Sequence, residues 1–201
     1  MDFSKTWSED KKLWTVLGIN VAMIAGLVLV GILAHSLGVL AAGGDYVSDA
    51  AAIAISILAL NISRHPHGHP NAKNYAALVN VLFMLTVTVL VIYGSIHRLT
   101  TNVQPIHGLP VFIMSSIGSV AMVLSAYILA AGKTNDLNMR AVLLDTTADA
   151  TFGAGVAAVG LIVFFAHRYY FLDPIVALVI ACVILFHAIN LLRQVTKELR
   201  N

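Results

Sequence analysis

The sequence LWTVLGINVAMIAGLVLVGILA, residues 13–34, decides the fold class because it is long, apolar and free of charged residues. A helix needs about 20 mostly apolar residues to cross the hydrocarbon core of a bilayer, and this stretch has that length. Other charge-free runs separate Lys73 from Arg98, Arg98 from Lys133, Asp149 from Arg168, and Asp173 from Arg193. The sequence therefore predicts a membrane protein.

Six membrane-spanning helices are predicted from these runs, at approximately 13–34, 39–62, 74–97, 109–131, 138–166 and 172–192. Helices are expected because lipid offers backbone groups no hydrogen-bonding partner and the alternation of a β-barrel is absent. The connections are short, so residues 1–201 are predicted to form a single all-α transmembrane domain. We expect no soluble C-terminal domain, since the chain stops nine residues after the sixth span.

The composition excludes several classes of protein. Hydrophobic residues make up 59% of the chain and charged residues 11%, whereas soluble domains have about 25% charged residues. A net charge of +2 without a basic patch argues against disorder and against nucleic-acid binding. The single cysteine, Cys182, cannot form an intrachain disulfide. No nucleophile–base pair and no cofactor motif is present, so we expect neither an enzyme nor a resident cofactor.

Lysine and arginine predict the orientation of the spans. Only Arg98 and Arg168 fall on one side of the membrane. The other ten fall on the side that holds both termini: Lys5, Lys11, Lys12, Arg64, Lys73, Lys133, Arg140, Arg193, Lys197 and Arg200. Because basic loops stay in the cytoplasm, we expect both termini there.

Four acidic residues lie inside predicted spans. Asp45 and Asp49 belong to the second span, and Asp145 and Asp149 to the fifth. A carboxylate at the centre of a bilayer costs roughly 2.5–3.5 kcal/mol, so such residues usually face a cavity and mark an ion path. Each pair has the spacing i, i+4, which puts both side chains on one helix face. Because the two spans are antiparallel, the four carboxylates are predicted to meet near the bilayer centre.

Such a cluster predicts exchange of protons for a divalent cation. Four like charges in a low dielectric favour protonation of the carboxylates, and a cation that binds there displaces the protons. The alternative is a role in helix packing, with these acids paired to Arg140, to His97 or to one another.

Nearly the whole chain resembles the cation diffusion facilitator family of divalent-metal transporters, most strongly in the second and fifth spans. The second helix of that family is similar to HSLGVLAAGGDYVSDAAAIAISILAL (35–60), and the fifth to LNMRAVLLDTTADATFGAGVAAVGLI (137–162). The sixth is similar to FLDPIVALVIACVILFHAINLL (171–192). The resemblance implies six helices, a homodimer, and exchange of metal for protons across the membrane. It also implies that Asp45, Asp49, Asp145 and Asp149 are the transport ligands.

The identity of the metal stays open. Zinc-transporting members of the family commonly carry histidine where this chain has Asp145. Carboxylates suit manganese, iron(II) or magnesium better than imidazole does, yet zinc also accepts aspartate oxygens. The transported ion is therefore expected to be zinc, iron, manganese or cadmium.

Weaker signals lie elsewhere. His65, His67 and His69 alternate in the loop between the second and third spans and form a possible secondary metal site, or merely a solvated loop. Asn20 in the first span either orients a carboxylate or makes an interhelical hydrogen bond. In the sixth span, His187 lies five residues after Cys182, so the two side chains point away from each other on a helix. We expect both to be packing residues.

Taken together, these features predict a proton-coupled antiporter in the cell membrane (the inner membrane in a bacterium), with metal ions, protons and lipid as partners. One alternative is a membrane sensor that binds metal at the same acids without moving it. Another is a proton-driven carrier of an organic cation. Such a carrier needs an aromatic lining, and only Tyr46 and Phe152 are near the acids in sequence.

Overall fold

The computed structural model describes residues 7–63, 72–101, 103–130 and 137–200. These residues form six helices and no strand: α1 Glu9–Leu33, α2 Leu37–Ser63, α3 Ala72–Thr100, α4 Gly108–Ala130, α5 Leu137–Ala166 and α6 Leu172–Arg200. All six are long and apolar enough to cross a membrane. The predicted all-α architecture is confirmed. The helices begin or end within a few residues of the predicted spans, except that α6 continues to Arg200.

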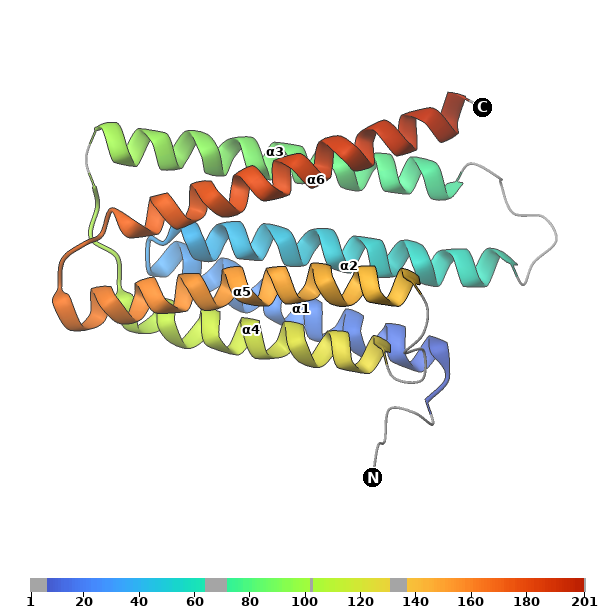
Figure 1. The fold of residues 1–201 in the computed structure, drawn as a ribbon, viewed down its shortest axis with the longest axis horizontal. Helices are drawn as coiled ribbons and strands as arrows, with labels where there is room; N and C mark the ends of the chain where they lie inside the picture. The colour runs from blue at the N-terminus through green and yellow to red at the C-terminus, as the bar shows by residue number, and fades with distance from the viewer. Residues whose placement is uncertain (1–6, 64–71, 102, 131–136, 201) are drawn as a thin grey trace.

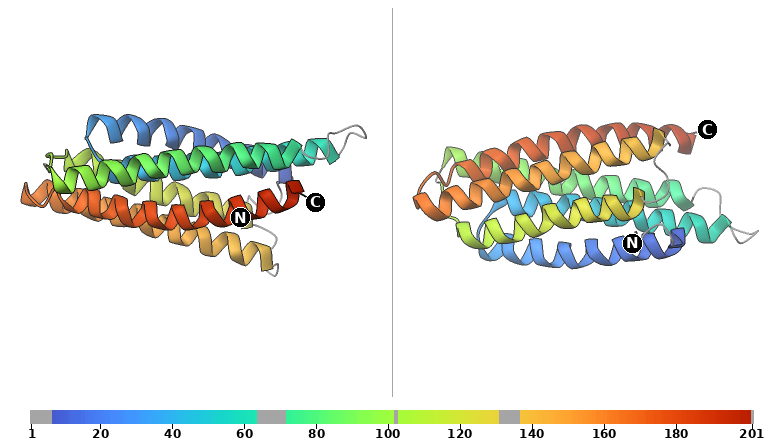
Figure 2. Two further views of the ribbon diagram at one scale, coloured as in Figure 1. Left: turned by 90° about the horizontal axis from the view of Figure 1, so that it is seen from above. Right: turned by 60° about the horizontal axis from the view of Figure 1, so that its bottom comes forward.

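The helices associate mainly as neighbouring pairs. α1 runs beside α2, α3 beside α6 and α4 beside α5, whereas α5 meets α2 and α6 over short stretches only. Figure 1 shows α6 diverging from α5 along the bundle, and the views in Figure 2 show how the six helices share one long axis. This loose contact leaves space between α2, α5 and α6.

Both the start of α1 and the end of α6 lie at one end of the bundle, which we call the terminal end (Figure 1). The opposite end, which we call the distal end, holds the connections 34–36, 101–107 and 167–171. An even number of spans requires this placement.

Apolar side chains cover the outside of the bundle, while several polar groups lie inside it. Val120 and Phe165 are 69% and 74% exposed, whereas Asn20 and Asp173 are 2% and 1% exposed. Lipid solvates apolar surface and leaves polar groups unsatisfied, so this distribution suits a bilayer and not water.

The turn from α1 to α2 is tight. The amide of Ser36 donates to the carbonyl of Gly31, and the amide of His35 donates to that of Ile32, which is the Schellman arrangement of a helix C-terminus. His35 stands at the position that needs a left-handed backbone, with φ 56°. Glycine is the residue usually found there.

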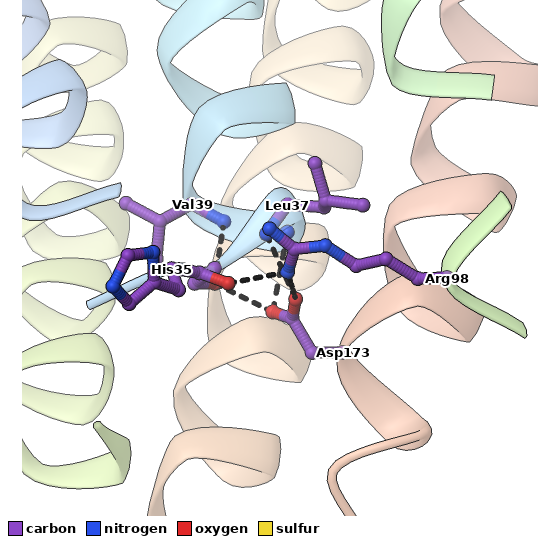
Figure 3. A network of polar contacts seen from close by, with 7 residues as sticks. His35, Leu37, Val39, Arg98 and Asp173 are labelled. Carbon is purple, nitrogen blue, oxygen red and sulfur yellow. Dashed lines mark hydrogen bonds and ion pairs between the residues drawn. The ribbon is translucent and has the colours of Figure 1, made fainter. Parts of the chain in front are cut away.

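A buried carboxylate from α6 completes the start of α2 (Figure 3). Asp173 accepts hydrogen bonds from the amides of Leu37 and Gly38 and from the hydroxyl of Ser36. Arg98 of α3 donates to the carbonyl of His35 and lies 3.9 Å from Asp173. The first amides of a helix have no partner within the helix. Asp173 supplies partners for two of them and joins α2 to α3 and α6 at the distal end.

Two glycines allow α4 and α5 to pack closely. A Cβ added at Gly160 would lie 2.6 Å from the amide nitrogen of Phe112, and one added at Gly108 would lie 2.5 Å from the carbonyl oxygen of Gly160. Small residues permit such backbone contact between membrane helices. The pair anchors α5, which carries two of the four predicted ligands.

Candidate metal site

Three of the four predicted ligands share one cavity. Asp45 and Asp49 of α2 and Asp149 of α5 line a space of about 320 Å³ and are partly buried. The other lining residues come from α2, α3 and α6: Ser48, Ala52, Asn80, Met84, His187, Asn190, Leu191 and Gln194. Carboxylates of two antiparallel helices therefore face the same polar space within the membrane-spanning part of the bundle.

The register of α2 and α5 explains this convergence. Asp45 is the ninth residue of α2, and Asp145 is the ninth of α5. Because the helices are antiparallel, Asp45 is brought level with Asp149, and both residues also line a small neighbouring pocket. The side chain of Asp145 lies outside the described part of the structure. Its place on α5 is one turn from Asp149.

Tyr46 joins α2 to α4 at the level of the carboxylates. Its buried hydroxyl donates to the carbonyl oxygen of Gly118. Asp45, Asp49 and Asp149 all lie close enough to this phenol to interact with it electrostatically. Sequence reasoning treated Tyr46 only as an aromatic residue near the acids, and its hydrogen bond to α4 required the three-dimensional packing.

Hydrogen bonds between α2 and α3 hold the opposite wall. The Ser48 hydroxyl contacts the Met84 sulfur at 3.4 Å, and the Asn80 side-chain amide donates to the Ser48 carbonyl at 3.5 Å. These contacts hold the Asp49 region of α2 against α3 without using a charged group.

A polar face of α6 forms a further wall of the cavity. His187, Asn190 and Gln194 follow the spacing i, i+3, i+7, which aligns them on one helix face. We had expected His187 to be a packing residue, and the sequence analysis missed its place beside the acids. The signal that could have found it is this run of three polar residues at helical spacing in an otherwise apolar span.

The cavity extends toward the terminal end. Asn80 lies early in α3, which starts at that end, while His187 and Gln194 lie late in α6, which finishes there. Toward the distal end, the Asp173 cluster holds α2, α3 and α6 together. The arrangement offers access to the acids from the terminal end.

A complete coordination shell is not assembled by the described residues alone. Among the side chains that the structure describes, no three His, Cys, Asp or Glu residues lie close enough to hold a metal ion. The four-aspartate site stays a prediction. His65, His67 and His69 lie outside the described residues.

The alternative pairing with His97 is disfavoured by position. His97 lies in the last turn of α3 at the distal end. Met84, the nearest cavity residue of α3, is thirteen positions earlier, or about 20 Å along a helix. The side chain of Arg140 lies outside the described part of the chain.

Asn20 points into the interior of the bundle. It is nearly fully buried, and within the described residues its Oδ1 atom has no hydrogen-bond partner. It does not line the carboxylate cavity. Among the described residues, therefore, no hydrogen bond to Oδ1 of Asn20 is found, and a contact of Asn20 with a carboxylate stays a prediction.

Comparison with known proteins covers nearly the whole chain. A profile described as the cation efflux transmembrane domain matches residues 13–200. The zinc transporter ZitB of Pectobacterium atrosepticum is 27% identical over 95% of this chain and 61% of its own length. ZitB of Escherichia coli is 28% identical over 96% of this chain and 63% of its own length.

A relative whose name covers more cations is the cadmium, cobalt and zinc/H(+)-K(+) antiporter of Bacillus subtilis. It is 28% identical over 91% of this chain and 61% of its own length. The chain thus spans about three fifths of the length of these relatives.

Proposed function

Because the chain belongs to the cation diffusion facilitator family, whose members are membrane transporters and not enzymes, we propose that it exchanges a divalent transition-metal cation for protons. The proposed ligands are Asp45, Asp49, Asp145 and Asp149. The resemblance also leads us to propose that the working unit is a homodimer.

The observation that carries the proposal is the shared cavity of Asp45, Asp49 and Asp149. Carboxylates that share a cavity inside a membrane-spanning bundle typically mark an ion path, and oxygen ligands bind divalent cations. Asp145 is proposed as the fourth ligand because it lies one helical turn from Asp149 and, in the antiparallel register, level with Asp49.

Proton coupling follows from the charge of the site. Several carboxylates around one cavity repel one another and hold protons while the site is empty. A divalent cation replaces those protons, because only deprotonated carboxylates are good ligands. The Bacillus subtilis relative, which is named as a metal/H(+)-K(+) antiporter, supports this proposal.

The direction of transport is inferred from charge and shape. The excess of Lys and Arg at the terminal end predicts that this end lies in the cytoplasm, and the cavity extends toward it. The cation then loads from the cytoplasm, and rearrangement of the helices exposes it on the distal side. The relatives support zinc and cadmium as cargo, and the aspartate oxygens also accept iron(II) and manganese.

Transport into proteoliposomes with an imposed pH gradient tests the proposal. Zinc uptake and lumenal pH are followed together, for wild type and for Asp49→Asn and Asp149→Asn. Each substitution keeps the shape of the side chain and removes its charge, so both fluxes should fall at least about tenfold. Asp10→Asn, at the start of α1 and outside the cavity, is the matched control and should transport normally.

The outcomes separate the possibilities. Wild-type rates in both cavity variants would show that the acids do not carry the cation. Zinc binding by wild type without zinc or proton flux would instead identify a sensor that does not translocate metal.

A further inference from the structure

We propose that His187 of α6 is an additional metal ligand of the transport path and makes the cavity prefer zinc and cadmium over manganese. This inference rests on the proposed function, because it concerns the same cavity. His187 was assigned to packing on sequence alone, and it lines the cavity together with Asp45, Asp49 and Asp149.

The placement of His187 within the span is the first argument. It lies inside the membrane-spanning part of α6, and its side chain is exposed. A histidine in a membrane span is costly in lipid and usually faces a cavity or a partner. Here the cavity is the one that holds the carboxylates.

The chemistry of the other lining groups is the second argument. Apart from His187 itself and the Met84 thioether, which contacts the Ser48 hydroxyl, the potential ligand atoms of the described lining are oxygens of carboxylate, hydroxyl and amide groups. Oxygen ligands suit manganese and magnesium, whereas an imidazole nitrogen suits zinc. His187 is the only imidazole among the described lining residues. It therefore supplies the nitrogen ligand that favours zinc over manganese.

Charge balance is the third argument. The cavity already contains three carboxylates, and a fourth anionic ligand would add repulsion in the empty state. A neutral imidazole adds a ligand without adding charge. It strengthens binding of a borderline cation while leaving unchanged the number of carboxylates available for proton exchange.

The order of polar residues along α6 indicates when an entering cation meets His187. Gln194, Asn190 and His187 lie in that order from the terminal end toward the acids, on one face of the helix. A hydrated cation from that end meets two amides, then the imidazole, then the carboxylates. His187 thus replaces a water ligand before the aspartates complete the shell.

Contact between α6 and α5 is limited, and the two helices diverge toward the terminal end (Figure 1). This freedom lets α6 bring the imidazole nearer to the acids when the cation binds. The described side chains do not form a three-ligand cluster, so such an approach is part of the proposal.

The test compares zinc with manganese in proteoliposomes containing the full chain. Initial rates are measured over a concentration series for wild type, His187→Gln and the control His97→Gln at the distal end. For His187→Gln, we expect KM for zinc to rise about tenfold, kcat to change less than twofold, and KM for manganese to stay unchanged. His97→Gln should match wild type with both ions.

A second variant and a spectroscopic measurement keep the test independent of protein yield. His187→Cys retains a ligand that binds zinc and cadmium, so it should restore the preference that His187→Gln loses. Cobalt(II) bound to the purified protein should change its visible absorption in His187→Gln and not in His97→Gln.

Two results would overturn the inference. One is an equal effect of His187→Gln on zinc and manganese, and the other is unchanged zinc kinetics with an unchanged cobalt spectrum. Failure of the proposed function is distinguishable, because in that case wild type itself would move no metal.

Discussion

The backbone amide of Leu37, the first residue of α2, donates a 2.8 Å hydrogen bond to Oδ2 of Asp173 in the first turn of α6. The two residues are 136 positions apart in sequence. Through this bond, the start of the helix that carries Asp45 and Asp49 depends on a carboxylate of another helix. From the sequence alone, Asp173 only marks the start of a charge-free run and has no assigned partner.

Replacing Asp173 by asparagine should destabilise the bundle. The amide nitrogen of asparagine cannot accept a hydrogen bond, so Leu37, Gly38 or Ser36 would lose its acceptor in a buried site. The loss should be about 1–3 kcal/mol of unfolding free energy. It can be measured by denaturant-induced unfolding in mixed micelles. Thr101→Ala, at an exposed position of the same end, serves as the control.

An unchanged midpoint for Asp173→Asn would show that the buried carboxylate does not stabilise the start of α2. Equal losses in Asp173→Asn and Thr101→Ala would point to a general sensitivity of the distal end.

Two glycines of α5 should respond oppositely to the same substitution. Gly160→Ala places a methyl group 2.6 Å from the Phe112 nitrogen and should cost about 1–3 kcal/mol through forced separation of α4 and α5. Gly155→Ala meets nothing within 4 Å and should be neutral or stabilising, because alanine favours helix. Thermal unfolding in detergent measures both. Similar melting temperatures for the two variants would contradict the close contact.

The backbone of His35 predicts a stabilising substitution. A residue other than glycine is strained at φ 56°. Glycine removes this strain but gives the unfolded chain more conformational freedom, which offsets part of the gain. The net effect of His35→Gly should be an increase of roughly 0.5–1 kcal/mol in the free energy of unfolding. His35→Ala removes the ring and keeps the strain. If alanine stabilises as much as glycine in thermal unfolding, then the ring and not the backbone is responsible.

Metal binding should weaken as pH falls. The cation needs deprotonated carboxylates, so each binding event releases protons and added protons compete with it. Calorimetry with zinc in buffers of different ionisation enthalpy gives the number of protons released. We expect a smaller number for Asp149→Asn than for wild type. Heats that are independent of the buffer would show that binding is not coupled to protons.

The six spans could be predicted because their signal is local. A run such as residues 13–34 is apolar over the thickness of a bilayer, and no distant contact is needed to recognise it. The pairing of Asp45 with Asp49 and of Asp145 with Asp149 is also local, since i, i+4 spacing defines a helix face. Convergence of the two pairs needed the further assumption that the second and fifth helices pack together.

The contacts of His187 and Asp173 could not be predicted from the sequence. Both lie in α6, and their roles depend on groups contributed by other helices. The sequence alone does not distinguish a histidine that faces lipid from one that faces a neighbouring helix or a cavity. Periodicity assigns a residue to a face of its own helix, but only packing selects what that face meets. Hydropathy and charge were therefore sufficient to predict the spans and to single out the acids as candidate ligands, whereas the polar wall of α6 and the buried contact at the start of α2 emerged only from the way the helices associate.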